Sequence, residues 1–214
     1  MTTVAARLWA APGWKLAGAG IYAAGFTAYA LAQHWRGSSA MTMPWTPIDL
    51  LIPVLPWLLV PYLLQLAVLG IPTLLMTDRR QLRIHLGGYL VINLVAVGCF
   101  FAMPTMVERA THGNALLSLV RAIDGAGNAC PSLHAACAVY AGLALPRVLA
   151  VGALLHAAVW VWVVLVLVSC VSLRQHTGYD VIAGSALAWV VDRGVVWWSA
   201  RGVLTQPMVQ QEAA

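Results

Sequence analysis

The sequence predicts an all-α protein: a polytopic integral membrane protein whose six transmembrane helices form one bundle with both termini in the cytoplasm. Only 9% of the 214 residues are charged and 61% are hydrophobic, whereas about a quarter of the residues of a soluble domain are charged. Six apolar runs approach the length that crosses a bilayer, and basic residues are concentrated in alternate gaps between them. No separate soluble domain or internal repeat is visible, so residues 1–214 are expected to form a single membrane domain.

The six apolar runs define the expected helices in order. A membrane-crossing helix needs about 20 apolar residues, and the runs cover roughly 16–33, 48–76, 86–103, 131–146, 148–171 and 176–198. The second run is over-long and contains four prolines, so it is expected to be kinked, tilted or broken near Pro72. The fourth run is short, because a rise of 1.5 Å per residue gives it about 24 Å of a hydrocarbon core of about 30 Å.

The first run also has features of a signal peptide. Arg7 and Lys15 precede it, and residues 30–32 (Ala-Leu-Ala) resemble a cleavage site. Removal of residues 1–32 is therefore left open as an alternative. The expected orientation of the later helices is the same in either case.

The distribution of basic residues predicts the orientation. With six spans, one side holds Arg7, Lys15, Arg79, Arg80, Arg83, Arg147, Arg193 and Arg201, and the other holds Arg36, Arg109, Arg121 and Arg174. The larger set is expected in the cytoplasm, because cytoplasmic loops carry an excess of Lys and Arg. The same parity puts Arg109, His134 and His176 on the non-cytoplasmic side. The sequence thus predicts a protein of the plasma (inner) membrane with its active site on the outer face.

Two polar stretches interrupt the apolar pattern. Residues 130–134 read Cys-Pro-Ser-Leu-His, and residues 174–180 read Arg-Gln-His-Thr-Gly-Tyr-Asp. Ionisable side chains at membrane depth are unfavourable and usually mark a functional site. Ser132 is well placed to N-cap the fourth helix, whose free N–H groups and positive dipole end would attract a phosphate. His134, in the first turn of that helix, would face the same opening.

The second stretch contains a histidine and a carboxylate one helical turn apart. If the sixth helix begins near His176, Asp180 can hold one imidazole nitrogen as N–H and leave the lone pair of the other nitrogen free. A histidine oriented in this way is a nucleophile. Arg109 and Arg174 can neutralise phosphoryl oxygens. These groups are sufficient to transfer a phosphoryl group without a metal or other cofactor.

The ordered motifs resemble the type 2 phosphatidic acid phosphatase (PAP2) superfamily. The resemblance rests on Pro-Ser-Leu-His at 131–134 and His-x-x-x-Asp at 176–180, both after an arginine, Arg109, that follows the third span. Flanking residues are similar to the subgroup that contains inositol phosphorylceramide synthases, namely Met103-Pro104-Thr105, Asp124, Asn128 and Asp180-Val181-Ile182-Ala183-Gly184. The similar core covers about residues 45–200.

The resemblance implies a role for each site residue. His176 would be the nucleophile that forms a phosphohistidine, and Asp180 would orient it. His134 would be the general acid for the departing lipid hydroxyl and then the base for the acceptor. Arg109 and Ser132 would hold the phosphate.

Two positions depart from the pattern of the family. The arginine that the family has six residues before the nucleophilic histidine is Cys170 here, and the lysine seven residues before Arg109 is Ala102. Arg174 is a candidate replacement for the missing arginine. These departures bear on phosphate affinity and substrate range more than on the type of reaction.

The sequence therefore predicts a metal-independent lipid phosphate phosphatase or phosphotransferase. Phosphatidate, a polyprenyl phosphate or diphosphate, or a related lipid would be the donor, and water is slightly favoured over an alcohol as the acceptor. The alternative is a non-enzymatic bundle whose histidines bind a metal or haem, or a degenerate member of the family.

The remaining features favour lipid as the partner. The net charge of +5 is not concentrated in a tract that would bind nucleic acid, and the ten tryptophans are typical of interfacial anchors. The sequence does not predict an oligomeric state. The four cysteines show no metal-binding pattern, and a disulfide between Cys130 and Cys170 is left open. Asp49 is interpreted as a helix cap, and Asp124 and Asn128 as turn residues.

Overall fold

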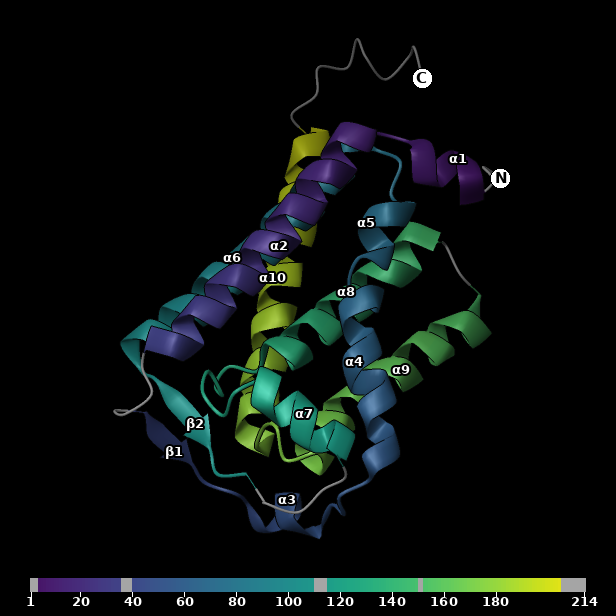
Figure 1. Cartoon of the computed structure of the whole chain (residues 1–214). Helices are drawn as coiled ribbons and strands as arrows, with labels where there is room; N and C mark the ends of the chain where they lie inside the picture. The colour runs from purple at the N-terminus through teal and green to yellow at the C-terminus, as the bar shows by residue number, and fades with distance from the viewer. Residues whose placement is uncertain (1–3, 36–39, 110–114, 150–151, 205–214) are drawn as a thin grey trace, which may run out of the picture.

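The computed structural model describes residues 4–35, 40–109, 115–149 and 152–204. These residues are mostly helical (Figure 1). In chain order the elements are α1 (Val4–Trp9), α2 (Pro12–Trp35), β1 (Met41–Met43), α3 (Pro47–Leu51), the 3-10 turn η1 (Pro56–Leu58), α4 (Leu59–Val68), α5 (Ile71–Leu75), α6 (Arg79–Ala102), β2 (Thr105–Val107), α7 (Ala115–Ile123), α8 (Leu133–Leu149), α9 (Ala153–Ser172) and α10 (Gly178–Leu204).

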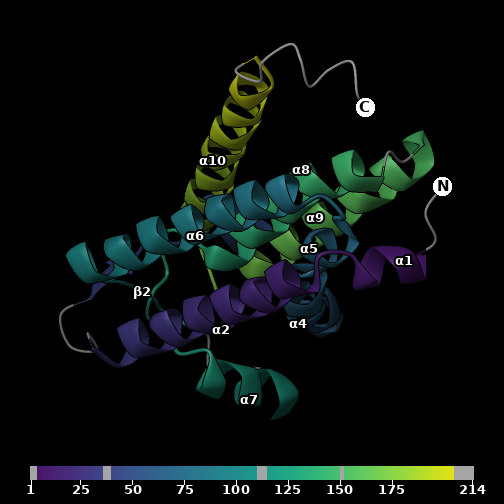
Figure 2. The ribbon, with the colours of Figure 1, turned by 90° about the horizontal axis from the view of Figure 1, so that it is seen from above.

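The long helices run between two ends of the molecule. Figure 1 shows α1, α5 and the last turns of α10 at one end, and β1, β2, α3 and α7 at the other. Figure 2, turned by 90°, shows α7 on the outside of the bundle, on the side of α2 and α4. Helix α8 packs against both α9 and α10, and α2 packs against α6. The end with β1, β2, α3 and α7 is also the end from which α8 and α10 start.

Among the residues that the structure describes, three helices are long and apolar enough to cross a membrane. They are Arg79–Ala102 (α6), Ala153–Ser172 (α9) and the segment Gly178–Ala200 of α10. The apolar segments Pro56–Val68 and Leu133–Leu149 are shorter. The structure therefore supports a helical, membrane-associated protein, whereas the six spans and the cytoplasmic position of both termini stay predictions.

The second apolar run forms several short helices. Helix α3 ends before Pro53, η1 and α4 follow, and α5 begins at Ile71 with Pro72 in its first turn. Proline has no N–H to donate, so it is tolerated in the first turn of a helix but interrupts a helix interior. Thr46 and Asp49 form a capping box at the start of α3, which confirms the interpretation of Asp49 as a helix cap.

Two short strands depart from the all-α prediction. β1 and β2 pair in parallel, with Met41 opposite Thr105 and Met43 opposite Val107. β1 follows α2 and β2 follows α6, so the pairing joins the ends of two neighbouring helices. Three-residue strands are too short to produce a recognisable alternation of polar and apolar residues.

A glycine allows α8 and α10 to start side by side. A Cβ atom on Gly184 of α10 would lie 2.2 Å from the carbonyl oxygen of Ser132, so only glycine fits there. The backbone N–H of Ser132 donates to the carbonyl oxygen of Asp180 at 3.0 Å. The two polar stretches of the sequence are thereby joined at one end of the molecule.

Candidate active site

The loop before α8 holds its residues in place by hydrogen bonds to neighbouring elements. The Ser132 hydroxyl accepts from the backbone N–H of Ala135 at 3.3 Å, the contact of an N-cap residue. The backbone N–H of Cys130 donates to the Thr105 hydroxyl of β2 at 2.8 Å. Ser132 is completely buried, and it lies two residues before the first histidine of the site.

The two histidines predicted to act together are neighbours. The ring centroids of His134 and His176 are 6.2 Å apart, and the rings are inclined by 52°. The His134 ring is also stacked on Tyr62 of α4, with centroids 4.0 Å apart and an angle of 17°. Tyr62 therefore fixes the plane of His134 beside His176.

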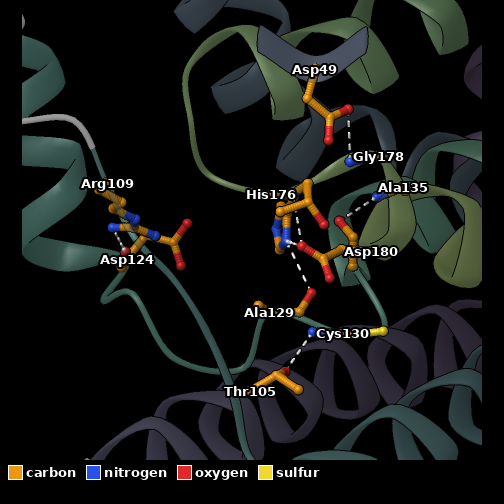
Figure 3. A network of polar contacts seen from close by, with 12 residues as sticks. Asp49, Thr105, Arg109, Asp124, Ala129, Cys130, Ala135, His176, Gly178 and Asp180 are labelled. Atoms are coloured by element: carbon orange, nitrogen blue, oxygen red, sulfur yellow. Dashed lines mark hydrogen bonds and ion pairs between the residues drawn. The ribbon is translucent and has the colours of Figure 1, made fainter. Parts of the chain in front are cut away.

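A backbone carbonyl determines which nitrogen of His176 carries the proton. Nδ1 of His176 lies 3.0 Å from the carbonyl oxygen of Ala129 (Figure 3). A carbonyl oxygen only accepts, so Nδ1 must be the N–H nitrogen, and the lone pair is on Nε2. The sequence reasoning assigned this orienting contact to Asp180 and missed Ala129, since a backbone carbonyl leaves no signal in residue type.

Asp180 lies beside the imidazole of His176 and also caps α10. Its Oδ2 atom is 4.0 Å from Nδ1 of His176, which is beyond hydrogen-bond distance. The same oxygen accepts from the backbone N–H of Thr177 at 2.7 Å. Asp180 is therefore placed to act on His176 through its charge, whereas the direct hydrogen bond comes from Ala129.

Burial keeps His176 neutral. The residue is 4% exposed, and burial, followed by the proximity of His134, lowers the pKa of His176 to about 3. At pH 7 the imidazole therefore has the unprotonated Nε2 atom that a nucleophile requires.

Asp124 completes the polar group around the histidines. Its carboxylate accepts from the hydroxyls of Tyr29 and Tyr62, each at 2.6 Å. Burial raises the pKa of Asp124, but the charge of His134 and the two phenol hydrogen bonds outweigh it, so the pKa lies below the ordinary value. The interpretation of Asp124 as a turn residue was therefore incomplete. Its partners come from α2 and α4, and no motif in the sequence links these helices to it.

These polar groups occupy one end of a mostly apolar cavity of about 440 Å³. His134, His176 and Asp124 line it together with side chains of α2, α4, α6, α7 and α8, most of which are apolar. Gln65 of α4 also lines the cavity; its Oε1 accepts from the Trp162 indole at 3.1 Å. The Nε2 atom of Gln65 is buried without a hydrogen-bond partner. The cavity thus combines a polar end, a long apolar wall and one unused donor in that wall.

Most of the chain is similar to one known protein family. A model of the PAP2 superfamily matches residues 56–192. The chain belongs to the PAP2 superfamily. No curated protein and no solved structure matches it. Membership indicates a phosphatase-type membrane enzyme, and PAP2 proteins in general act on lipid phosphates. Both histidines, Asp180 and Arg109 lie within the matched region of this PAP2 protein.

Arg109 is anchored on the backbone of the last turn of α7 and of the residues that follow it. Its Nη atoms donate to the carbonyl oxygens of Arg121, Asp124 and Gly125, and Figure 3 shows its guanidinium beside Asp124. These bonds use three of the five N–H groups of the guanidinium. The Nε atom is buried without a hydrogen-bond partner, so Arg109 of the PAP2 chain keeps donor capacity for a ligand.

Arg174 is committed to α3. Its Nη atoms donate to the carbonyl oxygens of Asp49 at 2.6 Å and Ile52 at 3.0 Å, and its guanidinium lies over the Trp45 ring, 5.0 Å from the centroid. Arg174 also has a positive φ of 58°. Its predicted role as the replacement for the arginine that is Cys170 in this PAP2 chain stays a prediction.

In the described part of the chain, the cysteines and acidic residues form neither a disulfide nor a metal site. Cys99, Cys130, Cys137 and Cys170 are all free thiols, so the disulfide left open for Cys130 and Cys170 is not formed. Within the described ranges, no group of three or more His, Cys, Asp or Glu side chains could hold a metal ion. The cluster that the fold does assemble is the histidine–aspartate group at the end of the cavity.

Proposed function

We propose that this PAP2 protein is a metal-independent lipid phosphate phosphatase or phosphotransferase that acts through a phosphohistidine on His176. The observation that supports the proposal most is the position of the His134 and His176 rings, 6.2 Å apart, at the polar end of one apolar cavity. In-line displacement at phosphorus needs a nucleophile and a proton donor around a single phosphoryl group. The apolar remainder of the cavity suits the hydrocarbon part of a lipid.

In the first half-reaction, the lone pair on Nε2 of His176 attacks phosphorus. The bond between phosphorus and the lipid oxygen breaks, and protonated His134 gives its proton to that oxygen, so the lipid leaves as a neutral alcohol. The proton on Nδ1 stays hydrogen-bonded to the Ala129 carbonyl oxygen, and the negative charge of Asp180 lies nearby. Both favour the positive charge that develops on the imidazole of His176.

In the second half-reaction, an acceptor hydroxyl attacks the phosphohistidine. Neutral His134 takes the proton of that hydroxyl, its oxygen bonds to phosphorus, and the bond between phosphorus and Nε2 breaks. Both histidines return to their starting states. Water as acceptor gives a phosphatase and an alcohol gives a phosphotransferase, as in the inositol phosphorylceramide synthase subgroup. We favour water slightly as the acceptor.

Arg109, Ser132 and Arg174 are the proposed phosphate-binding residues. The buried Nε–H of Arg109 has no partner, and the hydroxyl of Ser132 caps the helix that begins at the site, so each lies near the histidines with capacity to bind oxygen. The guanidinium of Arg174 is held at the end of α3 by two carbonyl oxygens and by the Trp45 ring. We place it third among these residues for that reason.

A comparison of histidine variants tests the proposal. Protein purified in detergent with EDTA is given phosphatidate or a polyprenyl phosphate, with and without an alcohol acceptor, and free phosphate and phospholipid products are measured. His176→Ala is expected to abolish turnover of every donor. His156→Ala is the matched control, because His156 is exposed on α9 and lies outside the cavity.

Two results would contradict the proposal. Turnover retained in His176→Ala excludes His176 as the nucleophile. A Soret absorption band in the purified protein, together with the absence of turnover, supports the haem-binding alternative. A phosphorylated protein that is stable in alkali and labile in acid, and that His176→Ala does not form, is the positive signature of the intermediate.

A further inference from the structure

A second cavity lies between α6 and α10, far from the histidines. It is a groove of about 610 Å³. On α10 it is lined by residues 191–198, which are 13 to 20 residues beyond the start of that helix at Gly178. At 1.5 Å per residue this is about 20 to 30 Å from the active site. The groove therefore lies near the other end of the bundle, where α6 starts and α10 ends (Figure 1).

Glycines on both helices leave the groove open. A Cβ atom on Gly87 of α6 or Gly194 of α10 would meet no other atom within 4 Å. Gly88 is different, because its Cβ would lie 2.1 Å from the Tyr140 hydroxyl, which requires glycine for packing. Gly87 and Gly194 thus serve no such close contact, and larger residues there would fill the groove.

The groove is cationic at one end and apolar along the rest of its length. Arg80, Ile84, Gly87 and Val91 recur at three- and four-residue spacing, so they lie on one face of α6. Arg80 and Arg83 are in the first turns of the helix, and Val91 is about 12 to 17 Å further along it. An elongated ligand would therefore meet positive charge first and hydrocarbon afterwards.

The wall on α10 has the same character. Val191 and Val195 line it, and Trp198 lies at the cationic end with 65% of its surface exposed. Arg80 donates to the carbonyl oxygen of Ser199 at 3.0 Å, which places its guanidinium beside Trp198. Tryptophan is enriched at the level of lipid headgroups.

Positive charge at this end exceeds the negative charge available to neutralise it. In the described part of the chain, two carboxylates lie near this end of the groove, those of Asp78 and Asp192. Asp78 caps α6 by accepting from the backbone of Gln81, and Asp192 is fully buried and paired with Arg147 and Arg193. Arg83 lies over the Trp14 ring, 5.8 Å from the centroid. Neither arginine of the groove therefore forms an ion pair with Asp78 or Asp192.

We propose that the α6–α10 groove binds one anionic phospholipid. Its phosphate lies on Arg80 and Arg83, Trp198 lies at headgroup level, and an acyl chain follows Val91 and Val191 toward the middle of the bundle. Basic pockets between membrane helices recognise anionic headgroups in this way. A second copy of this chain would also cover apolar residues, but it would have to bring carboxylates to the two arginines.

Native mass spectrometry of the delipidated His176→Ala protein tests the proposal, because this variant cannot consume the lipid. It is titrated with phosphatidylglycerol and separately with phosphatidylcholine. Adding Arg80→Ala and Arg83→Ala is expected to weaken phosphatidylglycerol binding about 10- to 30-fold and to leave phosphatidylcholine unchanged. Arg79→Ala is the matched control, because Arg79 is exposed in the same turn and does not line the groove.

Filling the groove is a second, uncharged test. Gly194→Leu is expected to reduce phosphatidylglycerol binding, whereas Gly98→Leu on α6 should not, since Gly98 is equally open but lies outside the groove. Equal binding in all variants, or an equal loss with Arg79→Ala, would mean that the lipid is bound nonspecifically and would overturn the proposal. A change from dimer to monomer in Gly194→Leu with unchanged lipid binding would identify the groove as a contact between copies instead. Phosphate release is measured separately, in Gly194→Leu protein that keeps His176. This measurement tests the proposed function, and its result does not depend on whether the groove binds a lipid.

Discussion

At the scale of single residues, the proposed chemistry depends on the tautomer of His176. Ala129 supplies only its carbonyl oxygen, yet this contact places the N–H on Nδ1 and leaves Nε2 for phosphorus. The side chain of residue 129 is therefore of little consequence, and the geometry of the loop before α8 is what matters. Substitutions that move this loop should affect the reaction as much as substitutions of the histidine itself.

The buried, neutral state of His176 predicts a dependence of stability on pH. The pKa of His176 is about 3 in the folded protein and about 6.5 in an unfolded chain. Between these values the unfolded state binds a proton that the folded state does not, so the free energy of unfolding is largest above pH 6.5 and falls as the pH decreases toward 3. His176→Gln cannot take up this proton. It is expected to lose less thermal stability than the wild type between about pH 7.5 and pH 4.5.

Scanning fluorimetry of both proteins in the same detergent measures this difference. The other buried histidines are present in both proteins, so their contribution cancels in the comparison. An equal decrease of the melting temperature in the two proteins would mean that His176 is not desolvated.

Asp124 is predicted to support His134 as the proton donor. The carboxylate and His134 line the same cavity, and the charge of His134 helps to hold the pKa of Asp124 below its ordinary value. Coulomb attraction is mutual, so the neutral amide in Asp124→Asn should make the protonated His134 less favourable. We expect kcat to fall about 10- to 100-fold, within the range that general acid catalysis contributes.

The pH profile separates this role from a structural one. One limb of the pH–rate profile reports the apparent pKa of the proton donor. If Asp124 acts through His134, this apparent pKa should shift in Asp124→Asn. Asp78→Asn, at the cap of α6, is the control and should leave the profile unchanged. A rise in KM with unchanged kcat and an unchanged profile would instead make Asp124 a binding residue.

The sequence could predict that His134, His176 and Asp180 lie together, because two short motifs carry them and the expected topology puts both motifs at one end of the bundle. It could not predict the surrounding group. Tyr29 and Tyr62 reach Asp124 across 95 and 62 residues, and each tyrosine lies in an apolar run where it resembles an ordinary buried aromatic residue. The uses of the arginines were equally hidden, since their partners are mostly backbone carbonyls.

At the scale of the elements, the contact between α8 and α10 determines whether the two histidines meet. Gly184→Ala would place a Cβ atom 2.2 Å from the carbonyl oxygen of Ser132, and backbone atoms cannot move aside as a flexible side chain can. We expect lower thermal stability and a loss of most activity, because the starts of the two helices must separate. Gly98→Ala is the control: its Cβ meets open space, and alanine is favoured over glycine in a helix by about 1 kcal/mol.

Measuring the melting temperature and phosphate release of both variants tests this packing argument. The expected pattern is a loss in Gly184→Ala and an unchanged or slightly higher melting temperature in Gly98→Ala. Normal activity in Gly184→Ala would contradict a contact this close between Gly184 and the Ser132 carbonyl.

The wall of the cavity predicts a preference among lipids. The Nε2 atom of Gln65 is a buried donor without a partner, and it lies one helical turn from Tyr62, the residue stacked on His134. Phosphatidate has ester carbonyls a few bonds from its phosphate, and one of them could accept this hydrogen bond. A polyprenyl chain has no acceptor at the corresponding position. Gln65→Leu is expected to lower kcat/KM for phosphatidate about 3- to 20-fold relative to a polyprenyl phosphate, the effect of one hydrogen bond. An unchanged ratio of the two values would remove Gln65 from donor selection.

The elements themselves were predicted only in outline. Apolar runs indicated where the long helices lie, because twenty apolar residues have few alternatives to a membrane helix. The division of residues 48–76 into α3, η1, α4 and α5 depends on several prolines acting together. Helix α7 was missed because its nine residues do not form a membrane-length run, although Leu117 and Val120 pack into the hydrophobic core around Tyr62.

At the scale of the whole molecule, two sites occupy opposite ends of one bundle. The histidines lie where α8 and α10 start, and the α6–α10 groove lies near the end of α10. The excess of basic residues at the groove end is the charge bias that predicts a cytoplasmic location. It follows that the active site and the groove would contact opposite leaflets, provided that the chain crosses the membrane as predicted.

Labelling of single cysteines tests this orientation. In a background with the four native cysteines replaced, Thr77→Cys lies between α5 and α6, and Met103→Cys lies at the opposite end of α6; both positions are exposed. A membrane-impermeant maleimide added to intact cells is expected to label Met103→Cys, whereas Thr77→Cys should require permeabilised cells. The two positions flank a helix long and apolar enough to cross the membrane, so labelling of both in intact cells would contradict the crossing by α6. The reversed pattern would keep the crossing but place His134 and His176 at the cytoplasmic face, where the lipid phosphate would have to be supplied from the inner leaflet.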